Sequence, residues 1–166
     1  MRAAPGLLLA LALLLPGCAL HPLYAGGGGG ATVKTLAQIE VAPMPGRAGW
    51  LMHNALTDRL GAPATPAYRL EVELDDQISG FGIRSDSAVT RERRTLRARY
   101  RLVEAGRGTV LLDATAGADA GVDVVSSEYA TIAAEQTALE NLTQDVATQI
   151  VTRLALYTKR TAAAAK

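Results

Sequence analysis

Hydrophobic and polar residues alternate along much of the middle of the chain. Over 68–75 every second residue is apolar and the residues between are charged, which is the pattern of a strand with one buried face. The alternation continues less regularly over 78–86 and returns over 89–103 and 110–120. The glycines within 104–108 suit a hairpin turn. The pattern therefore predicts three long strands in succession.

Two other segments have the periodicity of a helix, 47–60 and 127–157. In the second, apolar residues recur three, four or seven apart: Ile132, Leu139, Leu142, Val146, Ile150 and Leu154. A short alternating stretch over 33–41 predicts a further strand. The order is then β-α-β-β-β-α, and the apolar face of the sheet needs a cover. We therefore predict an α+β fold, a two-layer sandwich with two helices packed on one face of a four-stranded mixed sheet.

The N-terminus has a different pattern. Arg2 precedes ten consecutive apolar residues over 6–15. This run is shorter than the roughly 20 residues of a membrane-spanning helix and is typical of a secretory signal peptide. It ends in Leu-Pro-Gly-Cys at 15–18, which resembles the bacterial lipobox, a signal cut before a cysteine that then carries the lipid. The alternative is an ordinary signal peptide with an incidental cysteine. Because Cys18 is the only cysteine and stands at the required position, we expect a lipid on Cys18.

These features divide the chain into four parts. Residues 1–17 are predicted to be a signal peptide that is removed, and 18–34 to be a lipidated N-terminus with a glycine-rich tether. Residues 35–160 are predicted to form a single α+β domain, and 161–166 a disordered tail. Ala19 stands where enteric bacteria place an aspartate that retains lipoproteins in the inner membrane. Because alanine replaces that aspartate, we expect the lipoprotein to be anchored in the outer membrane, on the periplasmic side.

Composition and charge mainly exclude classes of partner and of functional site. The chain has 17 basic and 16 acidic residues and a net charge of +1, which argues against a nucleic-acid partner held by bulk charge. One cysteine and two histidines exclude a cysteine-rich zinc site and a histidine-dominated metal centre. No paired nucleophile and base indicates catalysis. We therefore expect no enzymatic activity, no metal and no cofactor apart from the covalent lipid.

The segment 84–101 contains seven arginines and only two acids. With a period of two, most of these arginines share the solvent face of the strand, about 6.8 Å apart. One explanation is pairing with acids of the neighbouring strands. The other is an anion site, because the planar guanidinium binds two phosphate oxygens at once, and the abundant phosphorylated anion of an outer membrane is lipopolysaccharide (LPS). The candidate residues for LPS or anion binding are Arg84, Arg91, Arg93 and Arg94.

Several short motifs occur along the chain in a characteristic order. They are Gly17-Cys18, Pro22-Leu23-Tyr24, Asn54 with Leu56 and Leu60, Tyr68 with Leu70, Val72 and Leu74, Thr90-Arg91, Ala98 with Tyr100 and Leu102, and Glu128-Tyr129-Ala130. In this order they resemble the LptE family of LPS-assembly lipoproteins, over nearly the whole chain after the signal peptide.

The resemblance implies a role and two partners. Members of this family plug the LptD β-barrel, assist its assembly and take part in delivering LPS to the outer leaflet. The nearest matches to the basic residues that the family uses for LPS are Arg91, Arg93 and Arg84. The alternative to this role is an auxiliary lipoprotein of another envelope lipid-transport system, which predicts phospholipid binding and no barrel partner.

Overall fold

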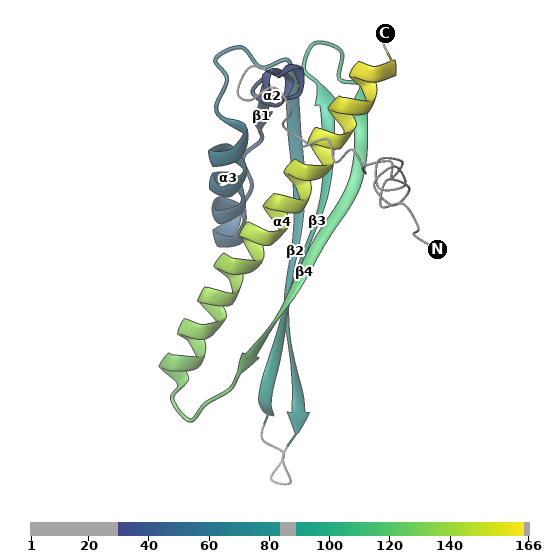
Figure 1. The fold of residues 1–166 in the computed structure, drawn as a ribbon. Coiled ribbons are helices and arrows are strands. Elements are labelled where there is room, and N and C mark those ends of the chain that lie inside the picture. Colours follow the sequence, from purple (N-terminus) through teal and green to yellow (C-terminus); the bar gives the residue numbers. More distant parts are fainter. Residues whose placement is uncertain (1–29, 84–88, 165–166) are drawn as a thin grey trace, which may run out of the picture.

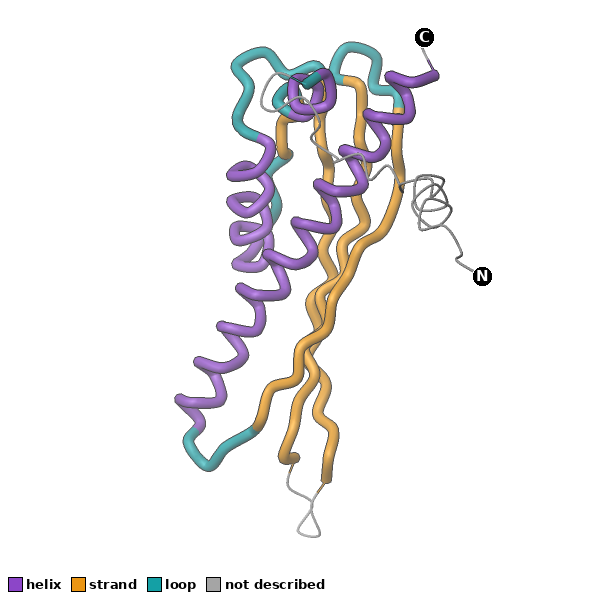
Figure 2. The backbone as a smooth tube through the Cα atoms, in the orientation of Figure 1, coloured by secondary structure: helices purple, strands orange, loops and turns teal. Residues whose placement is uncertain are grey.

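The fold is a long twisted sheet with helices along one of its faces (Figure 1). The computed structural model describes residues 30–83 and 89–164. Its elements, in chain order, are α2 (Ala31–Leu36), β1 (Ile39–Val41), α3 (Gly46–Leu60), β2 (Tyr68–Ile83), β3 (Val89–Glu104), β4 (Val110–Asp123) and α4 (Glu128–Ala164). Figure 2 shows the helices on one side of the sheet, with the described residues leaving the other side uncovered.

The sheet has the order β1-β2-β3-β4. β1 pairs with β2 in parallel, with Ile39 opposite Tyr68, whereas β2, β3 and β4 are antiparallel neighbours. This is the four-stranded mixed sheet that the sequence predicts, so the α+β class is confirmed. β2 and β3 each contain 16 residues, which corresponds to strands of about 50 Å.

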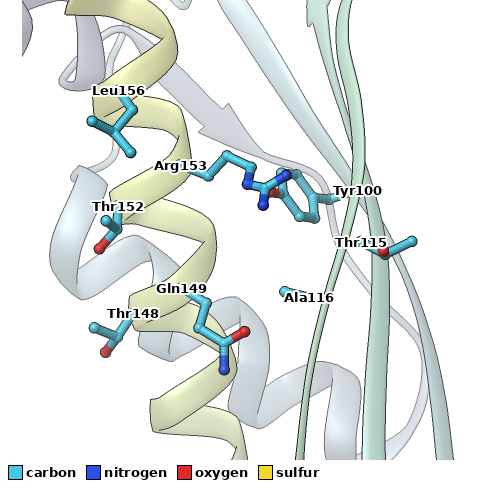
Figure 3. Close-up of a pocket in the computed structure, with 8 residues that line it drawn as sticks. All are labelled: Tyr100, Thr115, Ala116, Thr148, Gln149, Thr152, Arg153 and Leu156. Carbon is cyan, nitrogen blue, oxygen red and sulfur yellow. The ribbon is translucent and has the colours of Figure 1, made fainter.

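The core lies between this sheet and helices α3 and α4. The sheet contributes one face of alternate residues, all of them buried: Leu70, Val72, Leu96, Ala98, Tyr100 and Leu102. The helices contribute apolar stripes, including Met52 and Leu56 of α3 and Leu142, Val146, Ile150 and Leu154 of α4. Tyr100 points from β3 toward α4 (Figure 3). Because the apolar residues fill one face of β3, its alternate arginines lie on the other face.

The N-terminal part of the fold differs from the predicted strand over 33–41. The structure has the helix α2 there, and the strand β1 begins only at Ile39. A helix of six residues has no stability of its own. It forms because α2 packs against α4 and buries Leu36 in the core. The signal peptide 1–17, Cys18 and the glycine run lie outside the described residues, apart from Gly30, so the lipidated tether stays a prediction.

Helix α4 is longer than the 127–157 that the sequence predicts. It continues to Ala164, through residues for which we predicted a disordered tail. Alanine has the highest intrinsic helix propensity, and the Thr161 hydroxyl donates hydrogen bonds to the carbonyl oxygens of Tyr157 and Thr158 at 3.2 and 3.0 Å. The extension beyond the apolar stripe therefore rests on local propensity rather than on core packing.

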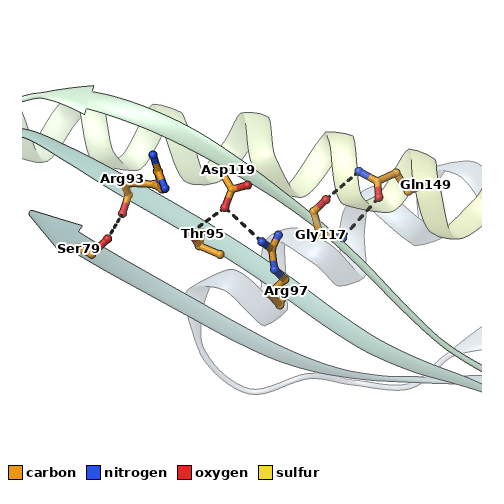
Figure 4. Close-up of polar contacts among 7 residues, drawn as sticks. All are labelled: Ser79, Arg93, Thr95, Arg97, Gly117, Asp119 and Gln149. Carbon is orange, nitrogen blue, oxygen red and sulfur yellow. Dashed lines mark hydrogen bonds and ion pairs between the residues drawn. The ribbon is translucent and has the colours of Figure 1, made fainter. Parts of the chain in front are cut away.

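A side chain of α4 pairs with the free edge of the sheet. The Gln149 side-chain amide donates to the Gly117 carbonyl at 3.2 Å and accepts from the Gly117 N–H at 3.4 Å (Figure 4). Both groups of Gly117 point away from β3, because backbone groups of alternate residues point to opposite sides of a strand. Gln149 thus occupies part of an edge that would otherwise offer its backbone to another strand.

Replacing Gln149 with leucine is expected to expose this edge and to promote edge-to-edge association. Analytical ultracentrifugation is expected to show a concentration-dependent increase in sedimentation coefficient for Gln149→Leu. Gln136→Leu is the matched control, since Gln136 is also exposed on α4. Equal association of the two variants would show that added apolar surface, and not the lost edge contact, is responsible.

Candidate functional site

The open face of the sheet carries the arginine row. Arg91, Arg93, Arg97, Arg99 and Arg101 alternate along β3 with the residues that face the helices. The register places β2 acids on one side of the row and β4 acids on the other, with Glu73 opposite Arg99 and Asp113 opposite Arg101. Arg84, the first candidate residue of this segment, lies outside the described residues.

Four arginines of this row have acidic partners. The ion pairs are Arg91–Asp123 at 2.8 Å, Arg97–Asp119 at 3.4 Å, Arg99–Asp113 at 2.8 Å and Arg101–Glu71 at 3.1 Å. The first three pairs are exposed and the Arg101–Glu71 pair is partly exposed, so each contributes little to stability. The hydrogen bond from Arg99 holds the pKa of Asp113 below its usual value. Most of the row's charge is thus neutralised within the sheet, as the pairing interpretation predicts.

Arg93 differs from the other arginines of the row. Within the part of the chain that the structure describes it has no ion pair, and its guanidinium carbon lies 5.3 Å from the centre of the Phe81 ring. Its neighbours across the ladder are Ser79 on β2 (Figure 4) and Gly121 on β4, and neither residue carries a charge. Arg93 is exposed, so its two-pronged donor set is available to an anion on the open face.

Arg94 lies on the opposite, helix-facing side and does not share a surface with Arg93. It forms a two-pronged pair with Asp76, with Nε–Oδ1 and Nη2–Oδ2 distances of 2.8 and 2.6 Å. Its Nη1 donates to the Glu135 carbonyl of α4 at 2.8 Å. The side chain is only 12% exposed. Arg94 therefore joins the sheet to the first turns of α4. Of the three candidate residues that the structure describes, only Arg91 and Arg93 share a face.

Glu92 is a functional-looking residue that the sequence analysis missed. It faces the helices beside Arg94, and its Oε2 is buried without a hydrogen-bond partner. Burial raises the pKa of Glu92, and a hydrogen bond with the Glu135 side chain and the charge of Glu135 raise it further. The one sequence signal that could have identified Glu92 is its place in the alternating pattern, where an acid stands at a position expected to be apolar. The ionised form of Glu92 therefore disfavours the folded state.

Glu92→Gln is expected to raise the free energy of unfolding at pH 7. The folded-state pKa is above the unfolded value, so the destabilising effect of Glu92 is present above the folded pKa and disappears as the pH falls toward 4.5. Urea unfolding at pH 7 and at pH 4 is expected to show a gain at pH 7 that shrinks at pH 4. Glu140→Gln, at an exposed pair with Arg47, is the control and is expected to show no such gain. An equal gain at both pH values would contradict this account.

No group of three or more potential metal-ligating side chains occurs in residues 30–83 and 89–164. None of the helices in these ranges has the length and apolar character that crossing a membrane requires. The exposed guanidinium of Arg93 can bind an anion on the open face.

Comparison with known proteins extends these observations. A lipoprotein of Caulobacter crescentus CB15 has a similar structure, with a TM-score of 0.66, 25% identity, and coverage of 77% of this chain and 96% of the other. Rare lipoprotein B of Shewanella oneidensis shares the fold at a TM-score of 0.56 and 9% identity, covering 70% of this chain and 91% of that one. Lipoprotein B of Nitrosomonas europaea also shares the fold, with a TM-score of 0.57 and 14% identity, and the match covers 73% of this chain and 82% of that one.

No curated protein sequence matches the chain. The model of the lipopolysaccharide-assembly family LptE, in contrast, matches residues 33–154. The match runs from α2 through most of α4 and includes the whole sheet with its arginine row. With the shared fold of the lipoproteins above, this extent shows that the chain is a member of the LptE family of lipopolysaccharide-assembly proteins.

Proposed function

We propose that this chain is a non-enzymatic outer-membrane lipoprotein that plugs the LptD β-barrel, assists its assembly and takes part in delivering LPS to the outer leaflet. Cys18 carries the lipid that anchors it on the periplasmic side. Arg93, with Arg91 beside it, binds LPS on the open face of the sheet. The observation that carries the LPS contact is the exposed Arg93 without an acidic partner in the described residues.

The open face suits the lumen of a barrel. Large barrel interiors are polar, and this face carries charged residues in ordered pairs over β2, β3 and β4. Pairing keeps the face nearly neutral, so a polar wall can cover it without leaving many uncompensated charges. A plug also needs rigidity, and two strands of 16 residues joined to α4 through a shared core supply it.

The LPS contact rests on the geometry of neighbouring arginines. Arg91 and Arg93 point to the same face, about 6.8 Å apart along the strand. Arg91 pairs with Asp123, but the two side chains are 59% and 71% exposed, so a phosphate can replace this carboxylate at small cost. Two guanidinium groups at this spacing offer charge-assisted hydrogen bonds to the phosphates of LPS. Arg84 is close in sequence and is a third candidate for this contact.

An LPS-binding assay on the Arg91→Asp/Arg93→Asp double variant tests the contact. We expect the affinity for LPS to fall at least tenfold, because two charge-assisted contacts are lost and two repulsive charges are added. Arg107→Asp is the matched control, since Arg107 is an exposed arginine in the turn after β3, and it is expected to bind like the wild type. Unchanged binding by a folded double variant would overturn the LPS contact. Preferential binding of phospholipid vesicles would support the other lipid-transport role.

A further inference from the structure

A second candidate site lies on the helix side of the sheet. A groove of about 360 Å³ runs between α4 and the sheet, with Tyr100 of β3 and Ala116 of β4 on one side. Thr152, Arg153 and Leu156 of α4 line the other side. Figure 3 shows Arg153 extending from α4 toward the ring of Tyr100. The arginine row lies on the opposite face of the same sheet, so this groove is separate from the site described above.

Arg153 has no acidic partner among the described residues. No ion pair or hydrogen bond of its guanidinium occurs there, and the one charge interaction that it makes is with Tyr100. Its other neighbours in the groove are hydroxyl, amide and apolar side chains. Arg94 and Arg47, which also approach α4, are both engaged with carboxylates. Arg153 is therefore an exposed arginine that lines the groove and has no protein acceptor among the described residues.

Tyr100 supplies a second unused donor. The residue as a whole is 1% exposed, and its hydroxyl makes no hydrogen bond within the described part of the chain. The hydroxyl oxygen is not among the fully enclosed atoms that lack a partner, so it reaches the open space of the groove that Tyr100 lines. Burial raises the pKa of Tyr100, and the positive charge of Arg153 opposes that rise, so the hydroxyl stays protonated and able to donate. The hydroxyl faces the same space as Arg153 (Figure 3).

We propose that this groove binds a phosphate monoester, with Arg153 donating to two phosphate oxygens and Tyr100 to the third. Thr152 adds a hydroxyl at the rim, and Ala116 and Leu156 contact the organic part of the ligand. Three donors suit the three terminal oxygens of a phosphate monoester better than the two oxygens of a carboxylate or the two terminal oxygens of a phosphodiester. The volume is at the lower end for small-molecule sites, which fits a ligand the size of a sugar phosphate or the headgroup of phosphatidic acid. This site goes beyond the proposed function, which uses the other face of the sheet.

Phosphorus NMR on the full lipoprotein in dodecyl maltoside micelles tests the proposal. The two probes are glucosamine phosphate and short-chain phosphatidic acid, which are both phosphate monoesters and distinguish a sugar phosphate from a phospholipid headgroup. We expect saturable line broadening with at least one probe. Arg153→Gln is expected to raise the dissociation constant about tenfold, and Tyr100→Phe is expected to raise it about threefold. Arg160→Gln, an exposed arginine further along α4 that does not line the groove, is the control and is expected to bind like the wild type.

Either of two results would overturn the proposal. One is saturable binding that Arg153→Gln leaves unchanged, and the other is the lack of saturable binding of both probes by the wild type. The Arg91→Asp/Arg93→Asp variant separates this inference from the LPS contact. It is expected to keep phosphate-ester binding in the groove while losing LPS binding on the open face. If the double variant loses probe binding to the same degree as Arg153→Gln, the two sites are not independent and the groove assignment is wrong.

Discussion

Replacing Ile150 with alanine is expected to lower the free energy of unfolding by about 3 kcal/mol. Ile150 is fully buried on α4, within the core that α4 shares with α3 and the sheet. The truncation removes three carbon atoms from this core and leaves a cavity, because helix and sheet are held in place by their other contacts. Urea denaturation measures the change. Unfolding is followed by circular dichroism at about 222 nm, where the signal reports helix content.

Leu156→Ala is the matched control for this variant. Leu156 lies on the same helix but is 39% exposed, so its truncation is expected to cost about 0.5 kcal/mol. Equal losses for the two variants would mean that α4 does not use the Ile150 side of the helix to contact the sheet. That result would contradict the two-layer packing.

Replacing Arg94 with methionine is expected to cost about 2 kcal/mol at pH 7. The variant loses the two-pronged pair with Asp76 and the hydrogen bond to the Glu135 carbonyl. It also leaves the carboxylates of Asp76 and Glu135 without the arginine that interacts with them. Repulsion between the remaining carboxylates requires their ionised forms. The loss of folding free energy is therefore expected to be smaller at pH 4. Hydrogen exchange is expected to accelerate first in the N-terminal turns of α4.

Arg97→Met is the control for the arginine change. Arg97 pairs with Asp119 on the open face, where the two side chains are 52% and 47% exposed. An exposed pair of this kind contributes at most about 1 kcal/mol. If Arg97→Met destabilises the protein as much as Arg94→Met, or if exchange in α4 is unaffected by Arg94→Met, then Arg94 does not fasten α4 to the sheet.

The sequence predicts those elements that bury one face. The alternation over 68–75 and 89–103 reports half-buried strands directly, because the side-chain period of a strand is two. Helix α2 could not be predicted in this way, since its six residues depend on contact with α4. The helical extension through 161–164 carries no apolar stripe, so periodicity gives no sign of it.

The candidate site was predictable only as far as the faces of β3. Alternation places Arg91 and Arg93 on one face and Arg94 on the other. Which arginine has a carboxylate partner depends on the register between strands, and the structure shows that β4 places Gly121 beside Arg93 and Asp123 beside Arg91. The groove at Tyr100 and Arg153 needs α4 to be seated on the sheet, and no local pattern of the sequence contains that information.

Purification of a tagged copy from gently solubilised outer membranes tests the central claim most directly. The account predicts that a large β-barrel, identified by mass spectrometry as LptD, is recovered with the tagged chain in equal amounts. A Cys18→Ala variant analysed in parallel shows how far this recovery depends on the lipid anchor. Recovery of the chain alone, or with an inner-membrane transporter in place of the barrel, would contradict the plug role and leave the arginine row to be explained by another anion or by its own sheet.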